Sequence, residues 1–174
     1  VPPGSGLGAS SSLAVNSIKT ISFLKGKNWK NEKIAEAAFH IEREILKHKV
    51  GKQDDYISAF GGFNYINFTK NRIKVNPIKL KKSTASEFEQ NLLLFYIGVT
   101  RNSNIILSKQ LEYIKKNNHD TINSLHYVRN LVEEFRDSLN NSDLREVGEL
   151  LHKGWMAKRK FVKGISNNHI DKIY

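Results

Sequence analysis

The stretch Val-Pro-Pro-Gly-Ser-Gly-Leu-Gly-Ala-Ser-Ser-Ser, residues 1–12, is the strongest local signal in the sequence. Glycine lacks a Cβ atom, so the backbone N–H groups of a glycine-rich loop can approach phosphate oxygens closely. A helix is expected to start at Ser10 or Ser11, and its N-terminal end carries a partial positive charge that attracts anions. These residues therefore predict a phosphate-binding loop that leads into a helix. A Gly/Ser linker or a plain helix cap remains the alternative.

The pattern of this loop differs from two common phosphate-binding motifs. A Walker A loop requires GxxxxGK[ST], and no lysine follows the glycines here. Gly4, Gly6 and Ala9 fit the dinucleotide-binding string GxGxxG/A, but that motif needs a strand before the loop. It also expects a strand about twenty residues further on, where this sequence has a second helical pattern. The dinucleotide interpretation is therefore disfavoured.

Hydrophobic periodicity outlines the rest of the chain as an α+β protein. A helix is expected to end before Gly26, a second is expected to follow Asn31 as its N-cap, and residues 51–62 read as a loop. A strand pair is expected at 63–68 and 72–80, and a buried strand at 92–99. Further helices are expected at 104–116, 121–139, 144–160 and 168–174. In the first helix, the residues expected to face a core are Leu13, Ile18, Ile21 and Leu24.

A second group of polar residues lies between Gly51 and Gly62. An Asp such as Asp54, in a loop flanked by glycines, can accept a proton from a substrate hydroxyl during phosphoryl transfer. Lys52 next to it would help to keep that carboxylate ionised. From spacing alone, neighbouring Lys and Asp side chains that simply face solvent are the simpler interpretation.

Composition excludes several classes of protein. The 174 residues include 39% hydrophobic residues, enough for a core, and no cysteine, which fits a cytoplasmic setting. The net charge of +11 comes from lysines spread along the chain without a recurring basic-aromatic motif, so nucleic-acid binding is not expected. The apolar run at 92–99 is too short to span a bilayer, so no membrane partner is expected.

The loop string resembles the second signature of the GHMP kinases, which wraps the phosphates of ATP. The matching residues are Pro2, Gly4, Gly6, Leu7, Gly8 and Ser10, and Ala9 departs from the usual Ser. The resemblance implies an ATP site formed by Pro3, Gly4, Ser5, Gly6, Leu7, Gly8, Ala9, Ser10 and Ser11. It also implies Mg²⁺, with Ser10 as one ligand.

The sugar-1-kinases of this family carry Gly-x-x-Asp-Gln at the second group, which makes Asp54 the implied catalytic base with Lys52 beside it. Asp55 stands where Gln is common, and it adds an ionisable group that can raise the pKa of one of the two carboxyls. The longer string from Gly51 to Asn64, together with Gly164–Asn167, resembles the heptose 7-phosphate kinases. The implied substrate-binding residues are Gln53, Tyr56, Gly61, Gly62 and Arg101.

The family also places an acidic Mg²⁺ ligand on the helix before the base, where this chain has Glu42 and Glu44. Two such residues on an α-helix point about 200° apart, so only one can face the site. The expectation favours Glu44 over Glu42.

The resemblance implies a two-lobe fold, with a ribosomal-S5-like ATP lobe and a ferredoxin-like lobe, incomplete at both ends. Residues 1–82 would be the latter part of the first lobe, and residues 83–174 the first part of the second. The implied activity is transfer of the γ-phosphoryl group of ATP to the anomeric hydroxyl of heptose 7-phosphate. The alternatives are another GHMP kinase, of galactose, fucose or mevalonate type, and a non-catalytic nucleotide-binding relative. A homodimer is one oligomeric state that the resemblance leaves open.

Overall fold

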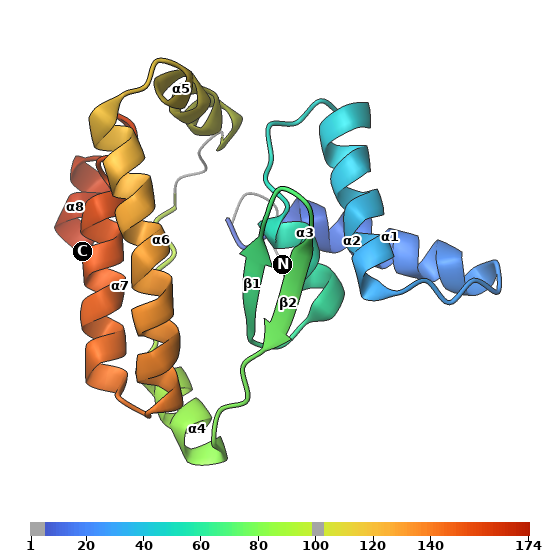
Figure 1. Ribbon diagram of the computed structural model, residues 1–174, viewed down its shortest axis with the longest axis horizontal. Coiled ribbons are helices and arrows are strands. Elements are labelled where there is room, and N and C mark those ends of the chain that lie inside the picture. The colour runs from blue at the N-terminus through green and yellow to red at the C-terminus, as the bar shows by residue number, and fades with distance from the viewer. Residues whose placement is uncertain (1–5, 99–102) are drawn as a thin grey trace. The chain divides into compact units, whose positions relative to one another are not determined.

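The computed structural model describes residues 6–98 and 103–174, which fall into two units (Figure 1). The first unit contains the described residues up to Ile78, with Gly98 and residues 103–104. The second contains Lys79–Ile97 and Ile105–Tyr174. The boundary expected at residue 82 lies close to this division, and the assignment of the two parts to particular lobes stays a prediction.

Three α-helices and one π-helical turn form most of the first unit. They are α1 (Ala9–Leu24), α2 (Asn31–His40), the π turn η1 (Ile41–Ile45) and α3 (Gln53–Phe60). Helix α1 stops before Gly26, whose φ of 65° is a left-handed conformation that favours glycine. Asn31 is the first residue of α2 and not its N-cap, because Lys30 occupies the cap position in an extended conformation.

Helix α3 corrects the expectation of a loop over residues 51–62. Its eight residues contain neither Gly nor Pro, and Asp54 and Asp55 lie in its first turn, where negative charge interacts favourably with the helix dipole. The helix ends at Gly61, with φ 66°. The glycines that suggested a loop are therefore the boundaries of a short helix.

The expected strand pair is confirmed as an antiparallel hairpin of β1 (Asn64–Phe68) and β2 (Ile73–Pro77). In the turn, the Thr69 backbone N–H donates to the carbonyl of Arg72 at 3.0 Å. Pro77 pairs with Asn64 at the open end of the hairpin, where a missing N–H costs little.

The core of the first unit forms where α1, α2 and α3 meet. Its buried members are Val15, Ile34, Ala35, Ala38, Tyr56 and Ala59. The expected inward face of α1 is only partly correct, because Ile18 packs against this core while Leu13, Ile21 and Leu24 are exposed. The reason is that α2 and α3 cover one side of α1, and none of the described elements covers its other apolar side.

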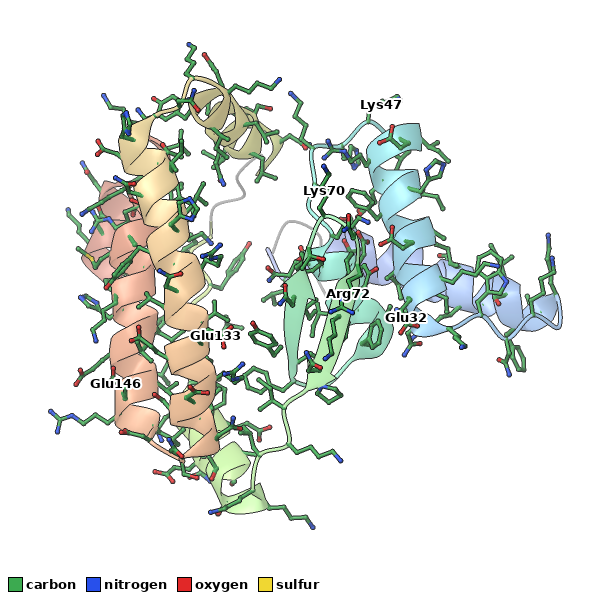
Figure 2. All side chains as sticks on the ribbon, viewed as in Figure 1. Glu32, Lys47, Lys70, Arg72, Glu133 and Glu146 are labelled. Atoms are coloured by element: carbon green, nitrogen blue, oxygen red, sulfur yellow. The ribbon has the colours of Figure 1, made fainter. Side chains whose placement is uncertain are left out.

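All the regular secondary structure among the described residues of the second unit is helical. It consists of α4 (Lys82–Gln90), α5 (Ser103–Lys115, with its first two residues in the first unit), α6 (His119–Asn140), α7 (Leu144–Lys158) and α8 (Asn168–Ile173). Helices α6 and α7 lie side by side (Figure 1) and bury Leu131, Leu139, Val147 and Leu150. The carboxylate of Asp143 accepts a hydrogen bond from the Glu146 N–H at 3.0 Å and so caps the N-terminus of α7. Figure 2 shows Glu146 on this helix.

One expectation for the second unit is wrong. The described part of the expected buried strand at 92–99 has no regular secondary structure, and Leu94 and Tyr96 are 82% and 79% exposed. A strand needs a hydrogen-bonded neighbour, and the described residues place none beside this segment. The described chain is thus mostly helical with one two-stranded sheet, and the ferredoxin-like lobe stays a prediction.

None of the described helices combines enough length and enough apolar character to span a bilayer.

Candidate active site

The described end of the glycine-rich loop leads directly into α1. Gly8 is the N-cap residue, with φ 69° and ψ 31°, and it has no side chain that could cap the helix. The first intrahelical bond at this end runs from the Ser12 N–H to the Gly8 carbonyl at 2.9 Å. The N–H groups of the residues before Ser12 therefore have no partner within the helix, which is the arrangement that binds anions. Pro3, Gly4 and Ser5 of the expected ATP site lie outside the described residues.

A buried hydrogen bond connects α1 to the π turn. The Ser11 hydroxyl donates to Oε2 of Glu42 at 2.9 Å, and the two residues are only 4% and 2% exposed. Glu44 instead points outward and pairs with Arg43 at 3.8 Å. Glu42 and not Glu44 therefore faces the first turn of α1, which reverses the expectation from the sequence.

Glu42 lies in a π turn. The Leu46 N–H bonds to the carbonyl of Ile41, five residues earlier, so the helix is wider here than an α-helix. Only one of Glu42 and Glu44 faces α1, as helix geometry predicts, but that geometry does not say which one. A π turn within a helix is also frequent at functional sites.

Asp54 lies beside the end of the loop. It is exposed in the first turn of α3, and a Cβ atom placed on Gly8 would lie 3.8 Å from its Oδ2 atom. The structure thus brings the residue expected as catalytic base next to the N-terminus of the helix expected to bind phosphate. Ser10, which is also expected near the metal, is exposed in the first turn of α1.

Asp55 is the most unusual acid in the described chain. It is 0% exposed, and neither of its carboxylate oxygens has a hydrogen-bond partner. Burial raises the pKa of Asp55 to about 7, and the negative charge of Glu42 contributes in the same direction. The nearby Ser11 hydroxyl lowers this pKa, but too little to restore the ordinary value.

Lys52 does not contact Asp54 in this structure. Its ammonium group donates to both carboxylate oxygens of Glu36 at 2.7 Å, and it lies 5.0 Å from the ring centre of Phe39. Burial alone would raise the pKa of Glu36, but the hydrogen bonds from Lys52 and Tyr56 lower it overall. The expected direct support of Asp54 by Lys52 is therefore not seen.

Glu36 was missed in the sequence, because its partners lie 16 and 20 residues away. The Tyr56 hydroxyl donates to Oε1 of Glu36 at 2.6 Å, and the ring of Tyr56 is 3% exposed in the core. Tyr56 is thus a core residue, and its expected contact with substrate finds no support.

The other expected substrate residues are placed as follows: Gln53 is exposed on α3, Gly61 and Gly62 end that helix, and Arg101 lies outside the described residues.

Among the described residues, no three His, Cys, Asp or Glu side chains gather closely enough to bind a metal by themselves. A separate hollow of about 580 Å³ lies in the second unit. It is lined by α6 and α7 residues that include Ser124, Tyr127, His152 and Lys153, and it contains none of the expected site residues.

Comparison with known families identifies the class of domain. The family described as the GHMP kinases N terminal domain matches residues 1–62, which contain the loop, Glu42, Asp54 and Asp55. This part of the chain is therefore a GHMP kinase N-terminal domain, and the resemblance drawn from the sequence is confirmed.

The chain is also similar to individual sugar kinases. The chain is 33% identical, over its whole length, to D-glycero-alpha-D-manno-heptose 7-phosphate kinase of Campylobacter jejuni and covers 51% of that protein. It is 28% identical over its whole length to the bifunctional fucokinase/GDP-fucose pyrophosphorylase of Arabidopsis thaliana, of which it covers 17%. The crystal structure of a D-glycero-D-manno-heptose 1-phosphate kinase from Bacteroides thetaiotaomicron matches 92% of this chain and 46% of its own, with a TM-score of 0.75 and 29% identity. The chain thus spans about half the length of the heptose kinases it resembles.

Proposed function

We propose that this chain is part of an ATP-dependent sugar kinase that phosphorylates the anomeric hydroxyl of D-glycero-D-manno-heptose 7-phosphate. The observation that carries the proposal is the position of Asp54 beside Gly8, at the uncapped N-terminus of α1. A proton acceptor next to a phosphate-binding helix end is the arrangement that phosphoryl transfer to a hydroxyl requires. The similarity to a heptose 7-phosphate kinase supports the choice of substrate.

The described residues fit the ATP and Mg²⁺ that such a kinase uses. The free N–H groups at the start of α1 would hold phosphate oxygens, and Gly8 leaves room for their approach. Ser11 and Glu42 offer hard oxygen atoms, the ligands that Mg²⁺ prefers, and Ser10 lies in the same turn. When bound, Mg²⁺ neutralises charge on the phosphates.

The chemical role of the chain's own residues follows from their positions. Asp54 would accept the proton of the sugar hydroxyl as that oxygen bonds to the γ-phosphorus of ATP and the bond from this phosphorus to the leaving ADP breaks. The dipole of α1 would stabilise negative charge at the phosphates. Glu36 would hold Lys52 and Tyr56, and through them the first turn of α3 that carries Asp54.

The proposal is tested by ADP release from Mg²⁺-ATP by the full-length protein, comparing heptose 7-phosphate with galactose, fucose, mannose and mevalonate. We expect turnover with the heptose phosphate, and a loss of about 10²- to 10⁴-fold in kcat for Asp54→Asn. Asp120→Asn makes the same chemical change at an exposed residue in the first turn of α6 and serves as control. Full turnover by Asp54→Asn would exclude Asp54 as the base.

A second candidate function is another sugar kinase of the same family, favoured by the similarity to the fucokinase. Turnover with fucose and none with the heptose phosphate would support it. ATP binding without turnover on any acceptor would favour a non-catalytic relative.

A further inference from the structure

Three oxygen-bearing side chains from three different elements meet under the first turn of α1. Ser11 comes from α1, Glu42 from the π turn and Asp55 from α3, and all three are less than 5% exposed. The hydrogen bond from Ser11 fixes one oxygen of Glu42. Both oxygens of Asp55 are buried without a partner, although Asp55 lies close enough to Ser11 and Glu42 to interact with both. Burying a carboxylate in this way is costly unless something compensates its charge.

Among the described residues, no Lys, Arg or His lies within 4.0 Å of the carboxylate of Glu42 or Asp55. The nearest lysine along the chain, Lys52, is bonded to both oxygens of Glu36 instead. Two adjacent buried carboxylates without a cationic partner therefore need a compensating charge from elsewhere.

A proton shared by the two carboxyls would remove one of the two negative charges, whereas a divalent cation would balance both. Mg²⁺ is commonly held by one or two carboxylates and keeps several of its waters, and its ligands are hard oxygens. Two carboxylates and a hydroxyl, each fixed on a different packed element, match that preference. The unpartnered oxygens of Asp55 are the acceptors that such a cation would use.

From these observations we propose that Asp55 joins Glu42 and Ser11 as a ligand of a divalent cation that binds without nucleotide. The inference deepens the proposed function, because it gives the cation of that site an additional acidic ligand. With two carboxylates in place of one, the site holds its cation before ATP arrives. ATP then meets a site in which the cation is already in place.

The test measures Mn²⁺ binding to the purified protein without nucleotide, by the loss of the free Mn²⁺ signal in electron paramagnetic resonance at pH 8. Mg²⁺ serves as competitor. We expect the wild-type protein to bind about one Mn²⁺, and Asp55→Asn to weaken its affinity by about 10- to 100-fold. Glu42→Gln should weaken it similarly. Asp120→Asn, the same change in the first turn of α6, should bind as the wild type does.

A second readout covers the case in which Glu42→Gln fails to fold. Mn²⁺ should raise the Tm of the wild type and of Asp120→Asn, because it binds only the folded state, and should leave the Tm of Asp55→Asn almost unchanged. No Mn²⁺ binding by the wild type without nucleotide, or equal affinity in Asp55→Asn, would overturn the proposal. These outcomes do not depend on turnover, so a full-length protein that binds Mn²⁺ through Asp55 but releases no ADP would refute the kinase and keep the cation site.

Discussion

The burial of the Asp55 carboxyl leads to a specific prediction about how the free energy of unfolding depends on pH. Its pKa of about 7 in the folded protein lies above the ordinary 3.8, so the folded state binds this proton more tightly than the unfolded state does. Burial of this carboxyl therefore does not reduce the stability of the folded protein below about pH 4. The cost grows as the pH rises and reaches its full value above about pH 7. Asp55→Asn keeps the shape of the side chain and removes the charge, so it should stabilise the protein at high pH.

The size of the effect follows from the shift of about three pH units, at about 1.4 kcal/mol per unit. The gain in unfolding free energy should approach about 4 kcal/mol at pH 8 as an upper limit and about 2 kcal/mol at pH 5. Relaxation and water entry around the charge reduce both values. The increase in the gain between pH 5 and pH 8 is the diagnostic quantity.

The measurement is urea unfolding of the wild type, Asp55→Asn and Asp120→Asn in EDTA at several pH values between 5 and 8. Asp120 is exposed, so its variant should differ little from the wild type at any pH. A gain for Asp55→Asn that stays constant with pH, or a loss of stability at pH 8, would refute the assignment of a raised pKa. Excess Mg²⁺ should shrink the gain, because the cation stabilises only the wild type in this pair.

Three further predictions concern the stability of individual elements, each measured by urea unfolding. Leu139→Ala, at a side chain that is 1% exposed in the second unit, should cost about 3 kcal/mol, and a loss below about 1 kcal/mol would mean that the core closes around the cavity. Asn118→Ala removes the N-cap hydrogen bond of α6 and should cost about 1 kcal/mol; an unchanged unfolding midpoint would show that water replaces the cap. Gly8→Ala should reduce the free energy of unfolding by about 1–2 kcal/mol, because alanine is strained in the left-handed backbone of this residue. The new Cβ would add no clash, since it would lie at an ordinary 3.8 Å from Asp54. Gly148→Ala, inside α7 with open space around it, should instead stabilise by about 0.5–1 kcal/mol, and equal effects of the two glycine substitutions would contradict the backbone argument.

Elements with local signals were predictable from the sequence. The hairpin of β1 and β2 follows from strand patterns on either side of a polar turn, and the cap of α7 follows from Asp143 and Glu146. The start of α1 follows from the glycines before it. Each of these features depends on residues only a few positions apart.

Features that depend on distant partners were not predictable in the same way. The exposed segment 92–96 has the composition of a buried strand, but strand formation depends on a neighbouring strand and not on composition. Helix geometry predicts that only one of Glu42 and Glu44 faces α1, but which of them does so depends on how the turn that carries them packs against α1. The bond between Glu36 and Lys52 depends on the packing of α2 against α3. The sequence thus indicated which residues gather near the loop, and the structure was needed to show which of them face it.

The hairpin has a consequence for local motion. A two-stranded hairpin alone is marginally stable in water, and the described residues place no third strand beside β1 or β2. It is held by apolar contacts of Ile66, Ile73 and Val75 with the helices. The rings of Phe68 and Tyr56 also pack edge to face, with their centres 5.7 Å apart. Its amide hydrogens should therefore exchange with solvent through local opening, well before the helices of the first unit unfold. Because Gly61 and Gly62 connect the hairpin to α3, such opening would leave the turn that carries Asp54 in place.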